Sequence, residues 1–317
     1  MSEEFIFSPD KVTASNISAL TEKQTVLEER RICELSELAD AVAALSSELM
    51  SEGMALLDVL SLLSDSPLPM FGKIHGYAMS ENISHLSGYV LSLSALDKAI
   101  FSELYKERLG MHLIKISEAD FLPSSDLPES FVYVKNSFAD EAYDVFSQDF
   151  SDPRVRYAQS FKDCLKLVNE GEVGYCLLPI EERGVRLPTV AQLLFNGDFK
   201  INSVTPVFGF DGNADMKYAL VSKSFSVPRL QSDDDRYLEI RIDEVQALRL
   251  SDLLLAVDIY GAAIYRVNTV FFDTEDGRRP YYSVIFKDEG REFSSLLTYL
   301  TLFAPAYVPI GIYKNLE

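Results

Sequence analysis

The spacing of apolar residues divides the chain into three regions with different predicted elements. From residue 1 to 110, apolar residues recur every three or four positions, which is the repeat of one face of an α-helix. One such series consists of Leu38, Val42, Leu45 and Leu49. A capping box at Thr21 and Gln24 predicts a helix start there. A second helix is expected from about Ser80 to Gly110.

Residues 111–226 alternate between short apolar runs and amphipathic stretches. This alternation is typical of a sheet with helices packed on it. Strands are expected at 131–134, 174–178, 200–204 and 217–221. Helices are expected at 140–150, 161–169 and 189–195. Ser160 is expected to cap the second of these helices, and Pro188 to begin the third.

A polar linker near 227–235 precedes the last region, residues 236–317. Its predicted order is strand, helix, strand, strand, helix, strand, which is the order of a ferredoxin-like sandwich. The expected elements are 237–242, 250–260, 265–273, 281–287, 293–303 and 307–312. The predicted fold class is therefore α/β and α+β, with three domains: a helical region 1–110, an α/β lobe 111–226 and a ferredoxin-like unit 236–317.

Charge narrows the possible partners. The chain of 317 residues has a formal net charge of -20. Such a field repels phosphate backbones and anionic lipid, so neither nucleic-acid nor membrane binding is expected. No uncharged apolar run approaches the roughly 20 residues that span a bilayer. The first residues lack the basic segment of a secretory signal. A cytoplasmic protein is expected.

Cysteine and histidine give no sign of a metal or redox centre. Cys33, Cys164 and Cys176 are widely spaced and form no CxxC motif. This usage is typical of buried thiols in a reducing compartment. The three histidines form no metal-binding pattern. We therefore expect neither a cofactor nor a metal.

The most informative stretch runs from Gly174 to Leu194. An apolar strand ends there in Pro-Ile-Glu, with Glu181 as its acid, and a short helix follows at Pro188. Open α/β sheets bind ligands at the carboxyl ends of such strands. The stretch resembles the prephenate dehydratase family, whose signature at this point is Pro-Ile-Glu-Asn-Ser. Glu182 and Arg183 stand here for the last two residues.

The resemblance covers about residues 128–317 and implies a dehydratase lobe followed by an ACT regulatory domain. The family's Gly-Thr-Phe-Ser turn corresponds to the segment that starts at Asn136. Ser137 and Phe138 would then face the substrate, together with Glu181 and Glu182. The glycine is absent, and without it the backbone approaches an anion less closely. The alternative role of Ser137 is a helix N-cap.

The family's catalytic Thr-Arg-Phe motif aligns with Met216, Lys217 and Tyr218. A hydroxyl can protonate the departing hydroxide of prephenate, and an arginine can bind a carboxylate through two parallel N–H bonds. Met216 has no proton to give, and Lys217 lacks the guanidinium fork. Losing such a donor costs on the order of 10²–10³ in rate. The resemblance therefore implies impaired dehydration, and an ordinary strand with an outward Lys217 is the alternative.

A full second lobe, as the family has, does not fit at its usual place, and residues 33–130, which could supply it, look helical. Only a dozen residues separate the strand ending at Val204 from Met216, which leaves no room for it. The substrate cleft of the family lies between its two lobes. The cleft is therefore expected to be absent or rebuilt from another subunit.

The ACT resemblance implies an effector site and pairing of subunits. The corresponding effector residues are Gln246, Ala247, Leu248, Gly261, Asn268 and Thr269. The family's effector-binding arginine is replaced. Arg249 or Arg266 could bind the carboxylate in its place, or be a surface charge. ACT domains commonly pair edge to edge, so a homo-oligomer is expected.

The helical region lies where bifunctional relatives carry a chorismate mutase. That enzyme needs several basic residues around a dianionic substrate, but no basic residue lies between Arg31 and Lys73. The similarity to chorismate mutase is one of position and helicity. A docking or dimerisation helix pair is the favoured interpretation.

Three functions follow as hypotheses. The first is a catalytically impaired relative that binds an aromatic amino acid or a prephenate-like molecule, as a regulatory module related to phenylalanine biosynthesis. The second is an active prephenate dehydratase with a rebuilt site. The third is a structural protein-interaction module. A cavity framed by Ser137, Glu181 and Lys217 together would support the first two.

Overall fold

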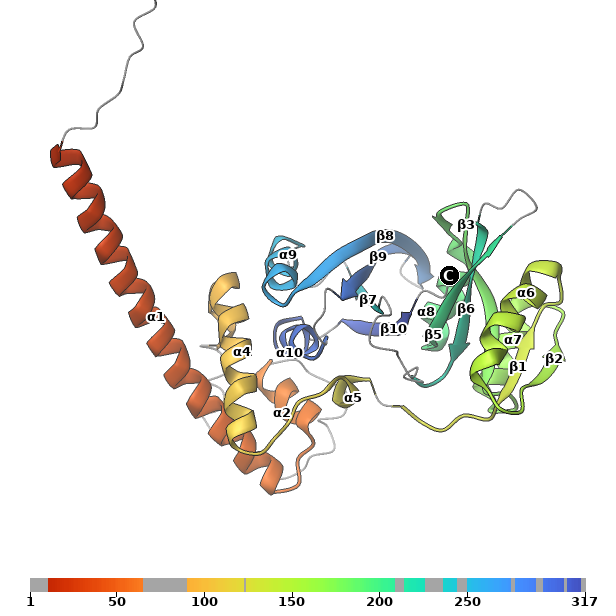
Figure 1. The fold of residues 1–317 in the computed structure, drawn as a ribbon. Helices are drawn as coiled ribbons and strands as arrows, with labels where there is room; N and C mark the ends of the chain where they lie inside the picture. The colour runs from red at the N-terminus through yellow and green to blue at the C-terminus, as the bar shows by residue number, and fades with distance from the viewer. Residues whose placement is uncertain are drawn as a thin grey trace, which may run out of the picture.

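The computed structural model describes residues 11–64, 90–122, 124–208, 214–225, 236–243, 250–274, 277–288, 293–304 and 307–314. The amino-terminal helices lie at one end of the molecule, the ferredoxin-like unit in the middle and the α/β lobe at the other end (Figure 1). A mixed α/β architecture with an amino-terminal helical region is the fold class that the sequence predicts.

The helical region is built from α1 (Lys11–Ser51), α2 (Leu56–Leu63), α4 (Ala95–Met111) and the short α5 (Glu118–Phe121). The predicted helix start at Thr21 is wrong, because α1 begins ten residues earlier. Thr21 lies inside the helix, where its carbonyl accepts a 3.0 Å bond from the Thr25 hydroxyl. Helix α4 is capped by Ser94, whose hydroxyl accepts the Asp97 N–H. The predicted start near Ser80 lies outside the described residues.

The lobe alternates strands and helices as predicted. Its elements are β1 (Ser130–Tyr133), α6 (Ser137–Phe146), the 3₁₀ turn η2 (Ser147–Asp149), β2 (Arg154–Tyr157), α7 (Phe161–Asn169), β3 (Tyr175–Glu182), β4 (Val185–Arg186), α8 (Pro188–Gly197), β5 (Lys200–Phe208) and β6 (Ala214–Ser222). Ser160 caps α7 and Pro188 begins α8, both as predicted. Strand β2 was not predicted, because all four of its residues are exposed and give no burial pattern.

The last region has the predicted βαββαβ order. It consists of β7 (Arg236–Asp243), α9 (Leu250–Ile259), β8 (Ala262–Thr274), β9 (Gly277–Asp288), α10 (Ser294–Phe303) and β10 (Val308–Lys314). Its strands lie in the order β10-β7-β9-β8, and each neighbouring pair is antiparallel. This is the strand arrangement of a ferredoxin-like sandwich.

The lobe and the ferredoxin-like unit share one continuous sheet, in the order β2-β1-β3-β6-β5-β10-β7-β9-β8, with β4 paired to β3. The two parts join where β5 runs parallel to β10, at Ile201 and Gly311. A Cβ on Gly311 would lie 2.6 Å from the Ile201 carbonyl oxygen. Glycine at this position therefore permits the close approach of the two strands.

The apolar clusters of the core do not follow the three regions of the sequence. One apolar cluster joins Val42 of α1 and Phe101 of α4 to Val257 of α9 and Leu300 of α10. The helical region thus covers the helices of the ferredoxin-like unit. Two further clusters lie on the two faces of the lobe. One, with α7 and α8, extends to Tyr237, Ile285 and Tyr313 of the ferredoxin-like sheet, and the other contains residues of α6. The opposite face of the ferredoxin-like sheet is left for the lobe to cover.

Candidate functional site

The stretch that resembles the family signature folds as a tight hairpin. Strand β3 continues to Glu182 and turns through Arg183 and Gly184 into β4. Both turn residues have positive φ, 48° and 78°, as a two-residue type I′ turn requires. The hairpin places Arg186 beside Glu181. Both side chains reach the ferredoxin-like unit, whereas Glu182 is exposed.

The three residues aligned with the catalytic motif point to two different faces of β6. Met216 and Tyr218 pack into the apolar cluster beneath α6. Tyr218 donates a 3.3 Å bond to Asn136, and burial raises the pKa of its phenol. Lys217 lies between them on the strand and points to the other face, where it is paired in register with Glu181. The motif therefore does not act as one constellation.

Ser137 and Phe138 lie on the α6 side of the sheet. Asn136 is the N-cap of α6, because its side chain accepts the Ala139 N–H at 2.9 Å. The predicted capping role of Ser137 is thus wrong, and Ser137 is an exposed first residue of the helix. Phe138 packs on the apolar cluster there. Glu181 and Lys217 share a cavity, but Ser137 does not line it.

This junction cavity lies between the lobe and the ferredoxin-like sheet. The cavity is small: the space that the centre of a water molecule can occupy in it is about 30 Å³. Its polar lining consists of Arg186, Lys217, Arg266, Glu181, Tyr237, Tyr265 and Tyr313. Arg266 comes from β8 and forms an ion pair with Glu181, whose side chain is 10% exposed. Lys217 is partly buried and has no hydrogen-bond or ion-pair partner among the described residues.

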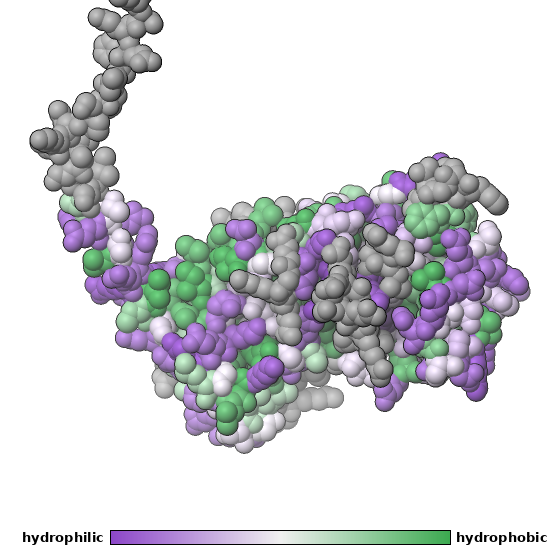
Figure 2. Space-filling model, viewed as in Figure 1, coloured by the Kyte–Doolittle hydropathy of each residue, from purple (hydrophilic) through white to green (hydrophobic). Residues whose placement is uncertain are grey.

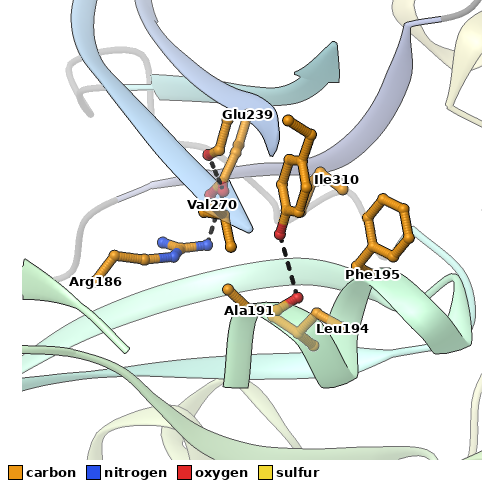
Figure 3. Close-up of a pocket in the computed structure, with 9 residues that line it drawn as sticks. Arg186, Ala191, Leu194, Phe195, Glu239, Val270 and Ile310 are labelled. Atoms are coloured by element: carbon orange, nitrogen blue, oxygen red, sulfur yellow. Dashed lines mark hydrogen bonds and ion pairs between the residues drawn. The ribbon is translucent and has the colours of Figure 1, made fainter. Parts of the chain in front are cut away.

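A buried polar network lies beside this cavity, and Figure 3 shows its ion pair between Arg186 and Glu239. Arg186 donates to Glu239 at 2.7 Å, and Glu239 is 1% exposed. Ser283 and Tyr313 also donate to this carboxylate, at 2.7 and 3.1 Å. Burial lowers the pKa of Arg186, but the Glu239 charge and hydrogen bond raise it overall. Burial raises the pKa of Tyr313 well above its usual value, so its phenol stays a proton donor.

A second, smaller hollow of about 10 Å³ lies on the other side of Arg186. Helix α8 of the lobe forms one wall and β8 to β10 the other (Figure 3). Tyr281 donates a 3.4 Å bond to the Ala191 carbonyl and stacks on Phe195. Arg241 lies 3.9 Å from the centre of the Phe195 ring. These contacts dock α8 onto the sheet.

The residues of this network were missed at the sequence level. In β7, Glu239 and Arg241 alternate with buried Leu238, Ile240 and Ile242. That alternation is typical of a strand whose polar face meets water. Here the lobe covers the polar face, so Glu239 is buried. Arg266 was considered as a carboxylate ligand, and its observed partner is the Glu181 carboxylate.

The proposed effector residues are only partly described. Gln246, Ala247 and Leu248 lie outside the described residues. Gly261 forms the turn before β8, with a φ of 64°. Asn268 is paired in register with Ser283 on the lobe-facing side, and its Nδ2 is buried without a hydrogen-bond partner in the described part of the chain. Thr269 is exposed.

The side chains that line the junction cavity carry the charge expected of an anion site. It holds more cationic than anionic side chains, although the whole chain is acidic. A space of about 30 Å³ admits one or two water molecules, whereas ligand pockets are typically about 300–1,000 Å³. A larger ligand could enter only if the two units moved apart.

Neither a metal group nor a membrane helix is found in the described ranges. No three His, Cys, Asp or Glu side chains there are placed to hold a metal ion. Among the same residues, no helix combines the length and apolar character needed to cross a bilayer.

Comparisons with known proteins give a similarity of fold. No family model matches the chain, and no curated protein matches it. A prephenate dehydratase from Streptococcus mutans is similar with a TM-score of 0.47 and 12% identity, over 59% of this chain and 99% of that one. A prephenate dehydratase from Arthrobacter aurescens, solved in complex with L-Phe, gives 0.43 and 12%, over 58% and 89%. GqqA, described as a novel type of quorum quenching acylase, gives 0.44 and 14%, over 59% and 95%. At these TM-scores and identities, function must be inferred from this chain's own side chains.

Proposed function

We propose that this chain is a divergent relative of the prephenate dehydratases that has lost efficient dehydration. In this proposal it binds a small carboxylate ligand, of the aromatic amino acid or prephenate type, as a regulatory module related to phenylalanine biosynthesis. The observation that carries the proposal is the junction cavity, where the lobe supplies Lys217 and the ferredoxin-like unit supplies Arg266. The site is therefore shared by two units of the fold.

The placement of the motif residues supports the proposed loss of catalysis. Dehydration needs a proton donor at the departing hydroxyl and a cation at the carboxylate. Met216 and Tyr218 face the α6 cluster, while Lys217 faces the junction cavity. Ser137, the remaining hydroxyl of the predicted site, lies near α6 as well. A single substrate on one face of the sheet could not use all of them.

Ligand binding at the junction is supported by charge and by surface. Lys217 is available for a carboxylate, and Arg266 is held by Glu181, whose place a ligand carboxylate could take. Three tyrosine rings in the same lining offer apolar surface to an aromatic ring. Because the ligand would lie between two units, its binding energy would shift how they dock. That coupling is the regulatory element of the proposal.

The test combines ligand-induced stabilisation with turnover. Phenylalanine, tyrosine and prephenate are added separately to the full chain, and the melting temperature is measured. A ligand at 100 times its dissociation constant should stabilise the chain by about 2.7 kcal/mol. Lys217→Met should remove most of this effect, while Lys162→Met, which changes an exposed lysine of α7, should not. No shift with any of the three compounds would leave a structural interaction module as the better hypothesis.

The second part of the test measures phenylpyruvate formation from prephenate. The proposal expects no turnover above background. Rates typical of enzymes, about 1–10³ per second, would establish the active dehydratase instead. The resemblance also implies a cytoplasmic homo-oligomer with effector binding near Gly261, Asn268 and Thr269, and these points remain part of the proposal.

A further inference from the structure

Helix α1 has an arm, residues 11–34, that extends away from the rest of the molecule (Figure 1). Every side chain from residue 21 to 34 is exposed, and Leu35 is the first buried one. The exposed residues include apolar Val26, Leu27 and Ile32, at 58%, 66% and 50%. Figure 2 shows the resulting mixture of hydrophilic and apolar surface on the arm. At 1.5 Å per residue the arm is about 36 Å long.

The arm needs packing to stay helical. Thr21, Thr25, Val26 and Ile32 are β-branched, and such residues lose side-chain freedom in a helix. The contacts Gln24–Glu28 and Arg30–Glu34 each add only about 0.2–0.5 kcal/mol. Most helical stability in proteins comes from tertiary packing of an apolar face. A partner along the arm would supply it.

We propose that the partner is a second copy of this chain, with the two arms antiparallel. The arm contains the run Val-Leu-Glu-Glu-Arg-Arg-Ile-Cys, residues 26–33. When this run is set against its own reverse, each acidic residue stands opposite a basic residue. Each apolar residue stands opposite another apolar residue. If the arms cross between Glu29 and Arg30, Glu29 faces Arg30 of the partner subunit. Val26 then lies level with Cys33 of the partner subunit, on the same helix face as Glu29 and Arg30. Leu27 and Ile32 flank this face on its two sides.

The opposite orientation is disfavoured by charge. Parallel arms in register would place acids against acids and bases against bases, which destabilises helix pairs. Arg31 is held by Asp97 of its own chain at 3.0 Å, so Arg30 is the cation left for the partner. The side chains of Arg30 and Glu34 are 76% and 46% exposed, so their ion pair contributes little free energy. Arg30 can therefore leave Glu34 for a carboxylate of the partner at little cost in free energy.

The body of the molecule favours the same orientation. The net charge of -20 makes two bodies repel each other. Antiparallel arms put the bodies at opposite ends of the crossing, with Leu35 and Leu35 of the partner subunit about 16 Å apart along the helix axis. That is about twice the Debye length of ~8 Å at physiological salt. The remainder of each arm then runs along the partner's α1, where Lys23 comes level with Ser36 of the partner subunit and Glu22 with Glu37 of the partner subunit.

The register is tested by cross-linking the full chain. Val26→Cys should form a disulfide-linked dimer with Cys33 of the partner subunit on oxidation with diamide. Unmodified chain is the matched control, because two Cys33 residues would be about 10 Å apart along the axis, beyond the roughly 7 Å limit for Cα atoms in a disulfide. Efficient cross-linking of the unmodified chain through Cys33 would indicate parallel arms and overturn the proposal.

The charge pairing is tested by sedimentation. The unmodified chain should sediment as a dimer, and Arg30→Glu should weaken dimerisation by at least about tenfold, since it creates two like-charge contacts. The double variant Glu29→Arg with Arg30→Glu restores the pairing and should dimerise within about threefold of the unmodified chain. Arg154→Glu, on exposed strand β2, should have no effect. A chain that is monomeric at every concentration, or a double variant as weak as the single one, would contradict the proposal.

Discussion

The ferredoxin-like unit is covered on its two sides by contacts of different composition. On the helix side, α1, α2 and α4 share one apolar cluster with α9 and α10. On the sheet side, apolar contacts between the lobe and the sheet are combined with two largely buried ion pairs, Arg186 with Glu239 and Glu181 with Arg266. Both contacts are within one chain, so their difference lies in chemistry and not in connectivity.

The difference indicates which contact can change. Each large apolar side chain buried on the helix side contributes about 1.5–3 kcal/mol without demanding one geometry. Buried ion pairs on the sheet side roughly offset their own desolvation and depend on exact partners. The helix side therefore acts as a permanent core. The sheet side is the place where a ligand carboxylate could compete with Glu181, although the strand pairing of β5 with β10 still tethers the two units.

The largest expected effect is on the helix side. Phe101 is fully buried, stacks on Tyr105 and contacts Phe303 of α10 edge to face. Phe101→Ala should lower the free energy of unfolding by about 3–5 kcal/mol, through lost burial and a cavity. Urea unfolding measures it. Leu96→Ala, which truncates a half-exposed leucine of the same helix, should change stability by less than about 0.5 kcal/mol. Equal effects of the two substitutions would mean that the helices do not share a core with α10.

The next effect is on the sheet side and has a different signature. Glu239→Leu leaves Arg186 buried without its carboxylate, which should cost about 3 kcal/mol. Adding Arg186→Met should recover most of that loss, because an apolar pair of similar volume is often as stable as a buried ion pair. Urea unfolding of the two single variants and the double variant forms the cycle. Additive losses in the double variant would show that the ion pair does not determine the contact.

The smallest effect lies at the edge of the helix side, where Arg31 of α1 binds Asp97 of α4. The hydrogen bond from Arg31 holds the pKa of Asp97 below its usual value. The stabilisation is therefore complete above the unfolded pKa of about 3.9 and is lost as pH falls through the lower folded pKa. Asp97→Asn should lower stability by less than about 1 kcal/mol at pH 7, since Arg31 is half exposed. The difference from the unmodified chain should vanish in acid, and thermal unfolding across pH checks this. A difference that grows in acid would contradict the assignment.

Most elements could be predicted from local signals. Ser160 and Pro188 marked the starts of α7 and α8, and apolar runs marked the strands except β2 and the two-residue β4. The start of α1 was misplaced, because Thr and Gln at capping-box spacing also occur inside helices, where Thr25 bonds the preceding turn. Ser137 was given the cap that Asn136 holds, since both residue types suit that position. The division into three domains remains a prediction, and the observed apolar cluster joins the first region to the third.

Only some residues of the candidate site could be predicted from the sequence. The pairing of Glu181 with Lys217 follows from two adjacent strands, and both residues came from the family resemblance. Glu239 gave no sequence signal, because β7 alternates as a solvent-facing strand does. Arg186 lies in a strand of two residues and Tyr313 in a mostly apolar strand, so neither stood out as part of a polar network. Ser137 was grouped with Glu181 by resemblance, yet α6 lies on the other face of the sheet.

By itself the sequence determined the order of helices and strands, the ferredoxin-like pattern and the acidic field, since periodicity, capping and charge are local properties. Only the tertiary structure decided that the lobe covers the polar face of the ferredoxin-like sheet and that the helical region covers its helices. The reason is physical. The alternation of apolar and polar residues in a strand shows that its two faces differ. Which face is buried depends on residues far away in the sequence, as with Glu181 and Arg266, which are 85 positions apart.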